Sequence, residues 1–164
     1  MRDKVRDLTA STLIVGSKIY KKRPDWRLNY PTAVGVDMLE GEGVDVVMNL
    51  ETDALPTSQF AHIVCISVLE HSRNPFALAA NLEQSLIKGG TIEISVPFAW
   101  RVHGYPSDYW RFTVEGVKVL FPNIEWDSLN MISYNEQHDR LPCITHDEKT
   151  YFARTEIIGI GKRL

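Results

Sequence analysis

Side chains that can do chemistry are concentrated in residues 95–113, which read SVPFAWRVHGYPSDYWRFT. Within this segment lie two arginines, one histidine, one aspartate, two tyrosines and two tryptophans. Histidine and aspartate side chains can transfer protons, and an arginine can hold an anionic group through paired hydrogen bonds. Aromatic side chains add large rigid surfaces that can exclude water. The segment is therefore the first place in the chain to look for a binding or catalytic site.

Several short apolar segments are typical of strands that position such a site. Four of them precede it and end in a glycine or a more polar stretch, at residues 12–17, 32–38, 44–50 and 60–71. Residues 91–98 follow the same pattern and lead directly into the aromatic segment. Two final strands are expected after it, at residues 124–134 and 151–162.

A helical period replaces the strand pattern after the Asn-Pro pair at residues 74–75. In PFALAANLEQSLIKGG the apolar side chains fall mostly on one helical face, at Phe76, Ala79, Ala80, Leu82, Leu86 and Ile87. The proline stands at a first helical position, and the Gly-Gly pair at residues 89–90 marks the expected end of the helix. A second, shorter helix is expected over residues 113–121.

Strands that alternate with helices predict an α/β fold, and we expect a Rossmann-like three-layer sandwich around a mostly parallel seven-stranded sheet. The last two strands are joined without a convincing helix, so they should form an antiparallel hairpin at one edge. The first crossover offers only KIYKKRPDWRLNYP, which contains a proline. It is short for a parallel connection, so its helix should be stunted or replaced by irregular structure. One domain over residues 1–164 is expected.

Composition and charge exclude several classes of protein. The chain of 164 residues is 44% hydrophobic and 24% charged, which is ordinary for a globular protein. A net charge of −3 gives no general attraction to nucleic acid, and the basic residues 18–23 are expected to be a solvated loop. There is no signal peptide and no apolar run long enough for a membrane span, so a cytoplasmic protein with no membrane partner is expected.

Cysteine and histidine spacing gives no sign of a disulfide framework or a metal centre. Cys65 and Cys143 are far apart and form no CxxC motif. The polar loop at residues 135–148 contains His138, Asp139 and His146, but this spacing matches no zinc signature. We therefore predict no metal ligand.

The strand ends bring together a recognisable set of motifs. Ligands of open parallel sheets bind beyond the carboxyl ends of the strands. Here these ends read LIVGS, VGVDM, VVMNLETDALP and, after the fourth and fifth strands, VLEHSRNP and SVPF. With the intervening helix, KGG and HGYPSDYWRFT, they resemble the class I S-adenosyl-L-methionine-dependent methyltransferases, in particular the small type 11 branch. The resemblance covers residues 12–121, and LEH followed by Asn-Pro, a helix, KGG and a strand is its most specific part.

The resemblance implies an S-adenosyl-L-methionine site at the first four strand ends. Asp37 would accept the ribose hydroxyls, and Gly16 would let the backbone approach the amino acid portion of the cofactor. The remaining cofactor contacts would come from Ser17, Met38, Asn49, Leu50 and Ser67. Two departures stand out: GSKIY replaces the common GxGxG loop, and Ala61 replaces the aspartate usual in the fourth strand.

The same resemblance makes the aromatic segment the wall of an acceptor site. Methyl transfer is an in-line displacement, so the enzyme must align the reactants and exclude water. The candidate catalytic residues are His71, His103, Asp108 and Tyr109. Substrate binding is expected from Arg101, Tyr105 and Arg111.

The segment has a purely structural interpretation as well. It could be a self-satisfied turn in which Asp108 pairs with Arg111 and Thr113 caps the following helix. Trp110 and Tyr109 would then plug the end of the sheet.

The leading functional hypothesis is methyl transfer to a small-molecule, saccharide or lipid-linked acceptor, with a homodimer as a further hypothesis. The alternative is a non-catalytic methyltransferase-like binding or scaffolding protein whose GSKIY loop is degenerate. A nucleotide-sugar or dinucleotide binder is a third hypothesis, although no GxGxxG motif is present.

Overall fold

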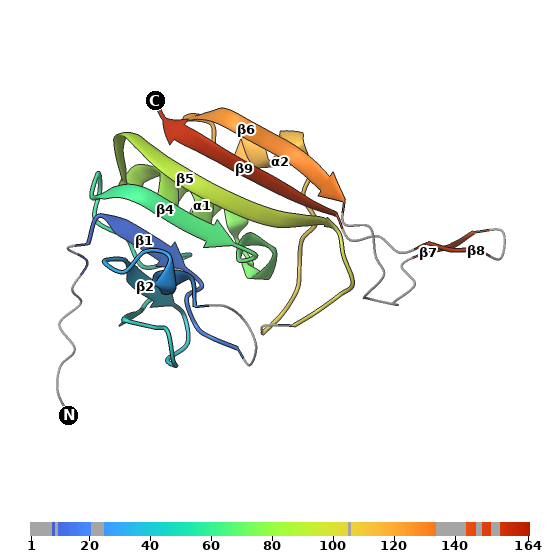
Figure 1. Ribbon diagram of the computed structural model, residues 1–164, viewed down its shortest axis with the longest axis horizontal. Coiled ribbons are helices and arrows are strands. Elements are labelled where there is room, and N and C mark those ends of the chain that lie inside the picture. The colour runs from blue at the N-terminus through green and yellow to red at the C-terminus, as the bar shows by residue number, and fades with distance from the viewer. Residues whose placement is uncertain are drawn as a thin grey trace.

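A seven-stranded mixed sheet, with strand order β3-β2-β1-β4-β5-β9-β6, organises the protein (Figure 1). The computed structural model describes residues 8, 10–20, 25–104, 106–133, 144–146, 149–151 and 155–164, of which 133, 144–146 and 149–151 only as backbone. The strands of this sheet are β1 (Thr12–Val15), β2 (Val34–Asp37), β3 (Val46–Val47), β4 (Phe60–Ile66), β5 (Leu86–Ala99), β6 (Ile124–Ser133) and β9 (Thr155–Arg163). A separate hairpin pairs β7 (Ile144–His146) with β8 (Lys149–Tyr151).

The pairing pattern confirms the predicted Rossmann-like α/β fold. Strands β3, β2, β1, β4 and β5 are parallel, whereas β9 runs antiparallel to both β5 and β6. The predicted antiparallel pair of final strands is thus present, with β9 inserted between β5 and the edge strand β6. The third predicted strand is shorter than expected, because β3 comprises only two residues.

Two helices, α1 (Pro75–Ser85) and α2 (Val114–Leu120), cover the same face of the sheet (Figure 1). Each begins at a capping side chain: Asn74 Oδ1 accepts from Ala77 N–H at 3.1 Å, and Thr113 Oγ1 accepts from Gly116 N–H at 3.0 Å. The expected end of the first helix is wrong. Leu86 already belongs to β5, because it pairs with Phe60 and is fully buried.

The opposite face carries irregular structure where a third helical layer was expected. The first crossover, residues 16–33, contains a single 3₁₀ turn, η1 (Trp26–Leu28), in its described part, which confirms the shortened crossover. Tyr30 fixes this segment over β4 and β5, since its hydroxyl donates to Glu93 Oε1 at 2.9 Å and its ring lies 5.2 Å from that of His62. Burial and the bond to Glu93 raise the pKa of Tyr30.

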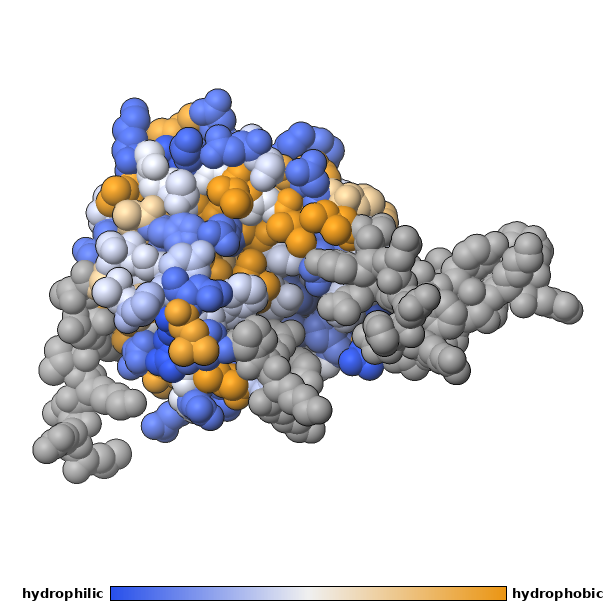
Figure 2. All heavy atoms as spheres, viewed as in Figure 1, coloured by the Kyte–Doolittle hydropathy of each residue, from blue (hydrophilic) through white to orange (hydrophobic). Residues whose placement is uncertain are grey.

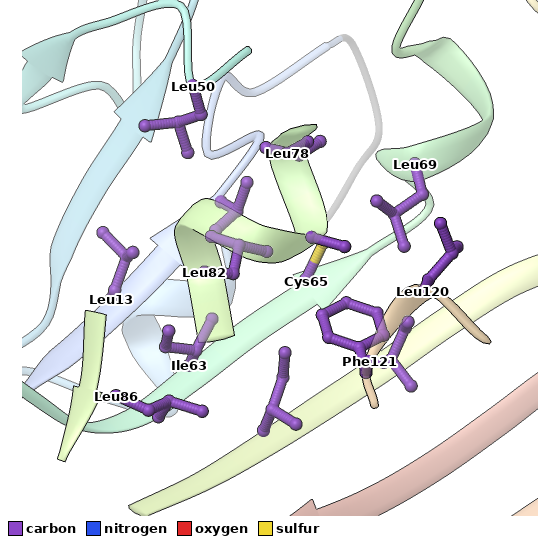
Figure 3. Packing of buried hydrophobic residues seen from close by; sticks show 14 of the residues in the cluster. Leu13, Leu50, Ile63, Cys65, Leu69, Leu78, Leu82, Leu86, Leu120 and Phe121 are labelled. Carbon is purple, nitrogen blue, oxygen red and sulfur yellow. The ribbon is translucent and has the colours of Figure 1, made fainter. Parts of the chain in front are cut away.

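The hydrophobic core lies between the sheet and the two helices (Figure 3). Leu82 of α1 and Phe121 after α2 contact the sheet face that presents Ile63 and Cys65. Complete burial raises the pKa of the Cys65 thiol, so this cysteine is a packing residue. Among the described residues, every helix is too short or too polar to span a bilayer.

Candidate functional site

Two cavities lie at the carboxyl ends of the parallel strands, and Ser67, directly after β4, lines both of them. The first cavity lies beyond the ends of the neighbouring strands β1 and β4. The strand order reverses between these two strands, so the cavity is at the topological switch point of the sheet. Its walls come from the ends of β1, β2 and β4 and from the loop after β3: Val15, Gly16, Tyr20, Val36, Asp37, Met38, Leu39, Asn49, Leu50, Glu51, Ser67, Val68, His71, Ser72, Leu78 and Pro106. Six of the seven residues predicted to bind a cofactor, all but Ser17, are in this set.

Both the backbone conformation and the lack of space for a side chain require glycine at position 16. Its φ of 66° lies in the left-handed region that side chains rarely adopt. A Cβ atom at this position would lie 2.6 Å from Cγ2 of Val68. Position 16, which lines the first cavity, therefore requires glycine.

Asp37 presents a fixed carboxylate at the first cavity. The backbone N–H groups of Leu39 and Lys18 donate to its Oδ1 at 2.9 Å and its Oδ2 at 3.2 Å, respectively. A carboxylate has about four acceptor positions, so these two bonds leave capacity for the hydroxyl groups of a ligand.

The loop after β3 supplies an apolar surface and an ordered turn. Asn49 Oδ1 accepts from Glu51 N–H at 3.1 Å, which makes its amide part of the turn. Met38 and Leu39, after β2, expose 49% and 39% of their surface beside it. Exposed apolar side chains that line a cavity can pack against a flat ring.

Asn81 of α1 holds this loop in place, and nothing in its spacing predicted that role. Its Nδ2 donates to the carbonyls of Leu50 at 2.9 Å and Asp53 at 2.8 Å. Its Oδ1 accepts from Leu55 N–H at 2.9 Å. One helical side chain therefore fixes three points of this loop, of which Leu50 lines the first cavity.

The side chain of Ser17 points away from the first cavity. It is buried, and its Oγ lies so close to β2 that a Cβ atom at Gly35 would be 2.7 Å from it. The backbone of Ser17 pairs with that of Val36. Contrary to the prediction, Ser17 is absent from the described residues that line this cavity.

Ser67 joins the two cavities in an uncommon conformation. Its φ is 54°, in the left-handed region that non-glycine residues rarely occupy, and its N–H donates to Ser95 O at 2.9 Å. Strained backbone of this kind clusters at functional sites. Ser67 therefore places an uncommon backbone conformation at the wall that the two cavities share.

The second cavity encloses about 300 Å³, a size suited to a small molecule. It is lined by residues from the ends of β4 and β5, the aromatic segment and β9: Ser67, Glu70, Pro97, Trp100, Arg101, His103, Gly104 and Glu156. Arg101 and His103 were predicted site residues. Glu70 and Glu156 were not predicted. Glu70 belongs to the LEH motif and Glu156 to a predicted strand, and neither pattern indicates that the side chain lines a cavity.

His71 and His103 are brought together although α1 and β5 separate them in the chain. Their ring centroids are 4.8 Å apart, and the rings meet edge to face. His71 Nδ1 lies 2.6 Å from Ser107 O, and His103 Nδ1 lies 3.0 Å from Asp108 Oδ2 and 3.1 Å from Arg101 O. All three partners are acceptors, so Nδ1 of each ring carries the proton.

Asp108 and Arg111 pair with each other, as the purely structural interpretation of this segment predicted. Arg111 donates to the two carboxylate oxygens of Asp108 at 2.6 and 2.9 Å, and also to the carbonyls of Trp100, Arg101 and Trp110. Burial alone would raise the pKa of Asp108, but the bonds from Arg111 and from His103 N–H lower it to about 2. An ionised, paired carboxylate is a poor proton acceptor near neutral pH.

Three of the described candidates for catalysis or substrate binding do not line either cavity. Tyr109 accepts from Arg73 Nε at 3.1 Å through its hydroxyl, and 44% of its surface is exposed. Asp108, Tyr109 and Arg111 are absent from the described residues that line either cavity. Tyr105 lies outside the described residues, as do the side chains of the polar loop at residues 135–148.

Comparisons with known proteins identify the fold. No family model and no curated protein sequence matches this chain. Solved structures do, among them S-adenosylmethionine-dependent methyltransferases from Methanosarcina mazei (TM-score 0.65, 11% identity) and Archaeoglobus fulgidus (TM-score 0.64, 14% identity). These alignments cover 93% of this chain in both cases, and 92% and 85% of the other chains.

A third similar structure contains ligands. It is the 1,6-didemethyltoxoflavin-N1-methyltransferase of Burkholderia thailandensis, with its substrate and S-adenosylhomocysteine bound. The TM-score is 0.64 at 13% identity, over 94% of this chain and 71% of that one. The similarities show that the chain has the Rossmann-like fold of the class I methyltransferases.

Proposed function

We propose that this protein is an S-adenosyl-L-methionine-dependent methyltransferase that acts on a small-molecule acceptor. The observation that carries the proposal is the pair of cavities that meet at Ser67 beyond the strand ends. One cavity would hold the methyl donor and the other the acceptor. Ser67 would then stand where the methyl group crosses.

The residues of the first cavity fit the cofactor. Gly16 lines this cavity without a side chain, so its backbone would lie beside the amino acid portion of the cofactor. The remaining acceptor positions of Asp37 suit the ribose diol, and Met38 offers an apolar surface to the adenine ring. When bound, S-adenosyl-L-methionine supplies a methyl group on a positively charged sulfur.

The second cavity would orient the acceptor and keep water away. Trp100 gives it an aromatic wall, while Arg101 and Glu156 offer one positive and one negative group for polar recognition. Asp108 and Arg111 would act indirectly, because their ion pair fixes the backbone that carries His103. A polar acceptor follows, such as a saccharide unit or the headgroup of a lipid-linked molecule.

The proposal is tested by calorimetric titration of the cofactor-free protein with S-adenosylhomocysteine. We expect binding that weakens about tenfold or more, or roughly 1.4 kcal/mol, in Asp37→Ala. Asp127→Ala is the matched control. This carboxylate is on β6, is 52% exposed, and makes an exposed ion pair with Lys162 Nζ at 3.5 Å. Absence of binding to the folded wild-type protein would contradict the proposal.

A non-catalytic binding protein is the second candidate, and one observation favours it. Ile132, Ile158 and Ile160 lie on the sheet face opposite α1 and α2, where Ile132 and Ile160 are 41% and 43% exposed. Figure 2 shows apolar side chains among polar ones on this face. A dimer in sedimentation experiments that Ile160→Lys dissociates, together with no binding of S-adenosylhomocysteine, would support this candidate.

A further inference from the structure

One carboxylate and two imidazoles converge between the two cavities. They belong to Glu70, His71 and His103, and each offers one ligand atom, so that the three atoms lie within 4.8 Å of one another. Glu70 Oε1 is 3.7 Å from the nitrogen of His71 and 3.9 Å from that of His103. Two atoms that each bind an ion at about 2.2 Å can be at most about 4.4 Å apart, so both distances suit a common ion.

The surroundings fix the two rings in the orientation that metal binding needs. Ser107 O accepts from Nδ1 of His71, and Asp108 accepts from Nδ1 of His103. A metal-binding histidine almost always donates its second ring N–H to a carbonyl or carboxylate in this way. In a neutral ring held so, the lone pair is on Nε2, and both Nε2 atoms face the carboxylate of Glu70.

The charge at this point favours a cation. Glu70 is only 1% exposed, and a buried carboxylate needs a compensating positive charge. A metal ion at the centre of the three atoms would add positive charge beside this buried carboxylate.

An ion at this position could reach the acceptor. Glu70 and His103 line the second cavity, and His71 lines the first. Three protein ligands leave at least one open coordination position, as in catalytic metal sites. Two imidazoles and one carboxylate select a transition-metal ion over magnesium or calcium.

We propose that Glu70, His71 and His103 bind a divalent transition-metal ion whose open position takes an oxygen or nitrogen atom of the acceptor. The role of the ion rests on the proposed methyl transfer, whereas its binding does not. An acceptor hydroxyl that contacts the ion loses its proton to solvent more readily. The O–CH₃ bond then forms as the S–CH₃ bond breaks, and the electron pair of the broken bond stays on sulfur.

Metal titration of the chelator-treated, full-length protein tests the site. Co²⁺ is the probe, because its visible absorption reports coordination, and Zn²⁺ should displace it. We expect one Co²⁺ site per chain whose affinity falls tenfold or more in Glu70→Gln and in His103→Asn. His62→Asn is the control, since His62 also lies near a glutamate, 3.1 Å from Glu93 Oε1, but within β4 and away from the carboxyl end of that strand.

Thermal melting and S-adenosylhomocysteine titration of the same samples separate the possible outcomes. The side chain of Glu70 is more deeply buried than that of His103. If Glu70→Gln fails to fold, the Co²⁺ affinity of His103→Asn still tests the metal site. No Co²⁺ spectrum, or a spectrum with the same affinity in a folded variant, would overturn the metal site. A Co²⁺ site that depends on both residues supports the proposed metal site even if S-adenosylhomocysteine fails to bind. In that case only the proposed methyltransferase function is contradicted.

Discussion

Gly16 and Ser67 both adopt positive φ values, of 66° and 54°, beside the first cavity. Gly16 follows β1 and Ser67 follows β4, and β1 and β4 are neighbours in the sheet. Each backbone turns sharply there instead of continuing its strand. At the scale of single residues, the shape of the first cavity therefore depends on two local conformations that most side chains disfavour.

Gly16→Ala should destabilise the protein for two separable reasons. The left-handed conformation costs an alanine about 1–2 kcal/mol, and the new methyl group would collide with Val68. Gly89→Ala isolates the first effect, because Gly89 has a φ of 77° and no atom lies within 4 Å of a Cβ built there. We expect urea unfolding to show a larger loss for Gly16→Ala than for Gly89→Ala. Equal losses would mean that Val68 moves aside without cost.

At the scale of elements, α1 does more than cover the sheet. Its buried side carries Leu78 and Leu82 into the core, whereas Asn81 reaches the loop that follows β3. That loop has little regular structure to support it, because β3 is only two residues long. The helix therefore stabilises the first cavity as well as the core.

Asn81→Ala should affect stability and ligand binding together. The substitution removes three hydrogen bonds and leaves the carbonyls of Leu50 and Asp53 without their donor. We expect the free energy of unfolding to fall by about 2–3 kcal/mol. Calorimetry should also show weaker binding of S-adenosylhomocysteine. The exposed Gln84 of the same helix provides the control, and Gln84→Ala should change neither quantity appreciably.

At the scale of the whole molecule, the two faces of the sheet are unequal. Both described α-helices cover one face (Figure 1), while on the other face Tyr30, which follows η1, contacts Glu93 of β5 and the ring of His62 in β4. Two isoleucines of β9 make the difference visible. Ile157 is fully buried, whereas Ile160 is 43% exposed on the opposite face.

Substitutions in β9 should therefore have contrasting effects. Ile157→Ala leaves a cavity under the helices and should cost about 2–5 kcal/mol. Ile160→Ser should stay within about 0.5 kcal/mol, because exposed positions contribute little. Urea unfolding at low protein concentration measures both. A large loss for Ile160→Ser would indicate that a further part of the chain or a second copy covers this face.

The sequence by itself determined the local elements and the place of the site. Periodicity and capping residues are local signals, so the strands, the starts of α1 and α2 and the reduced first crossover followed from them. Because strand ends in a parallel sheet share one edge, Gly16, Asp37 and Asn49 could be assigned to one cavity before any contact was known. The end of α1 was missed, since the pairing of Leu86 with Phe60 overrides the helical period.

Only the tertiary structure decided which distant polar groups meet. The insertion of β9 brings Glu156 to the second cavity, and the turn closed by Asp108 and Arg111 brings His103 to Glu70 and His71. Such contacts depend on strand order and on the path of a loop, neither of which has a local period. The residue types near a ligand follow from the chain sequence, whereas their mutual distances, and hence their chemistry, follow from packing.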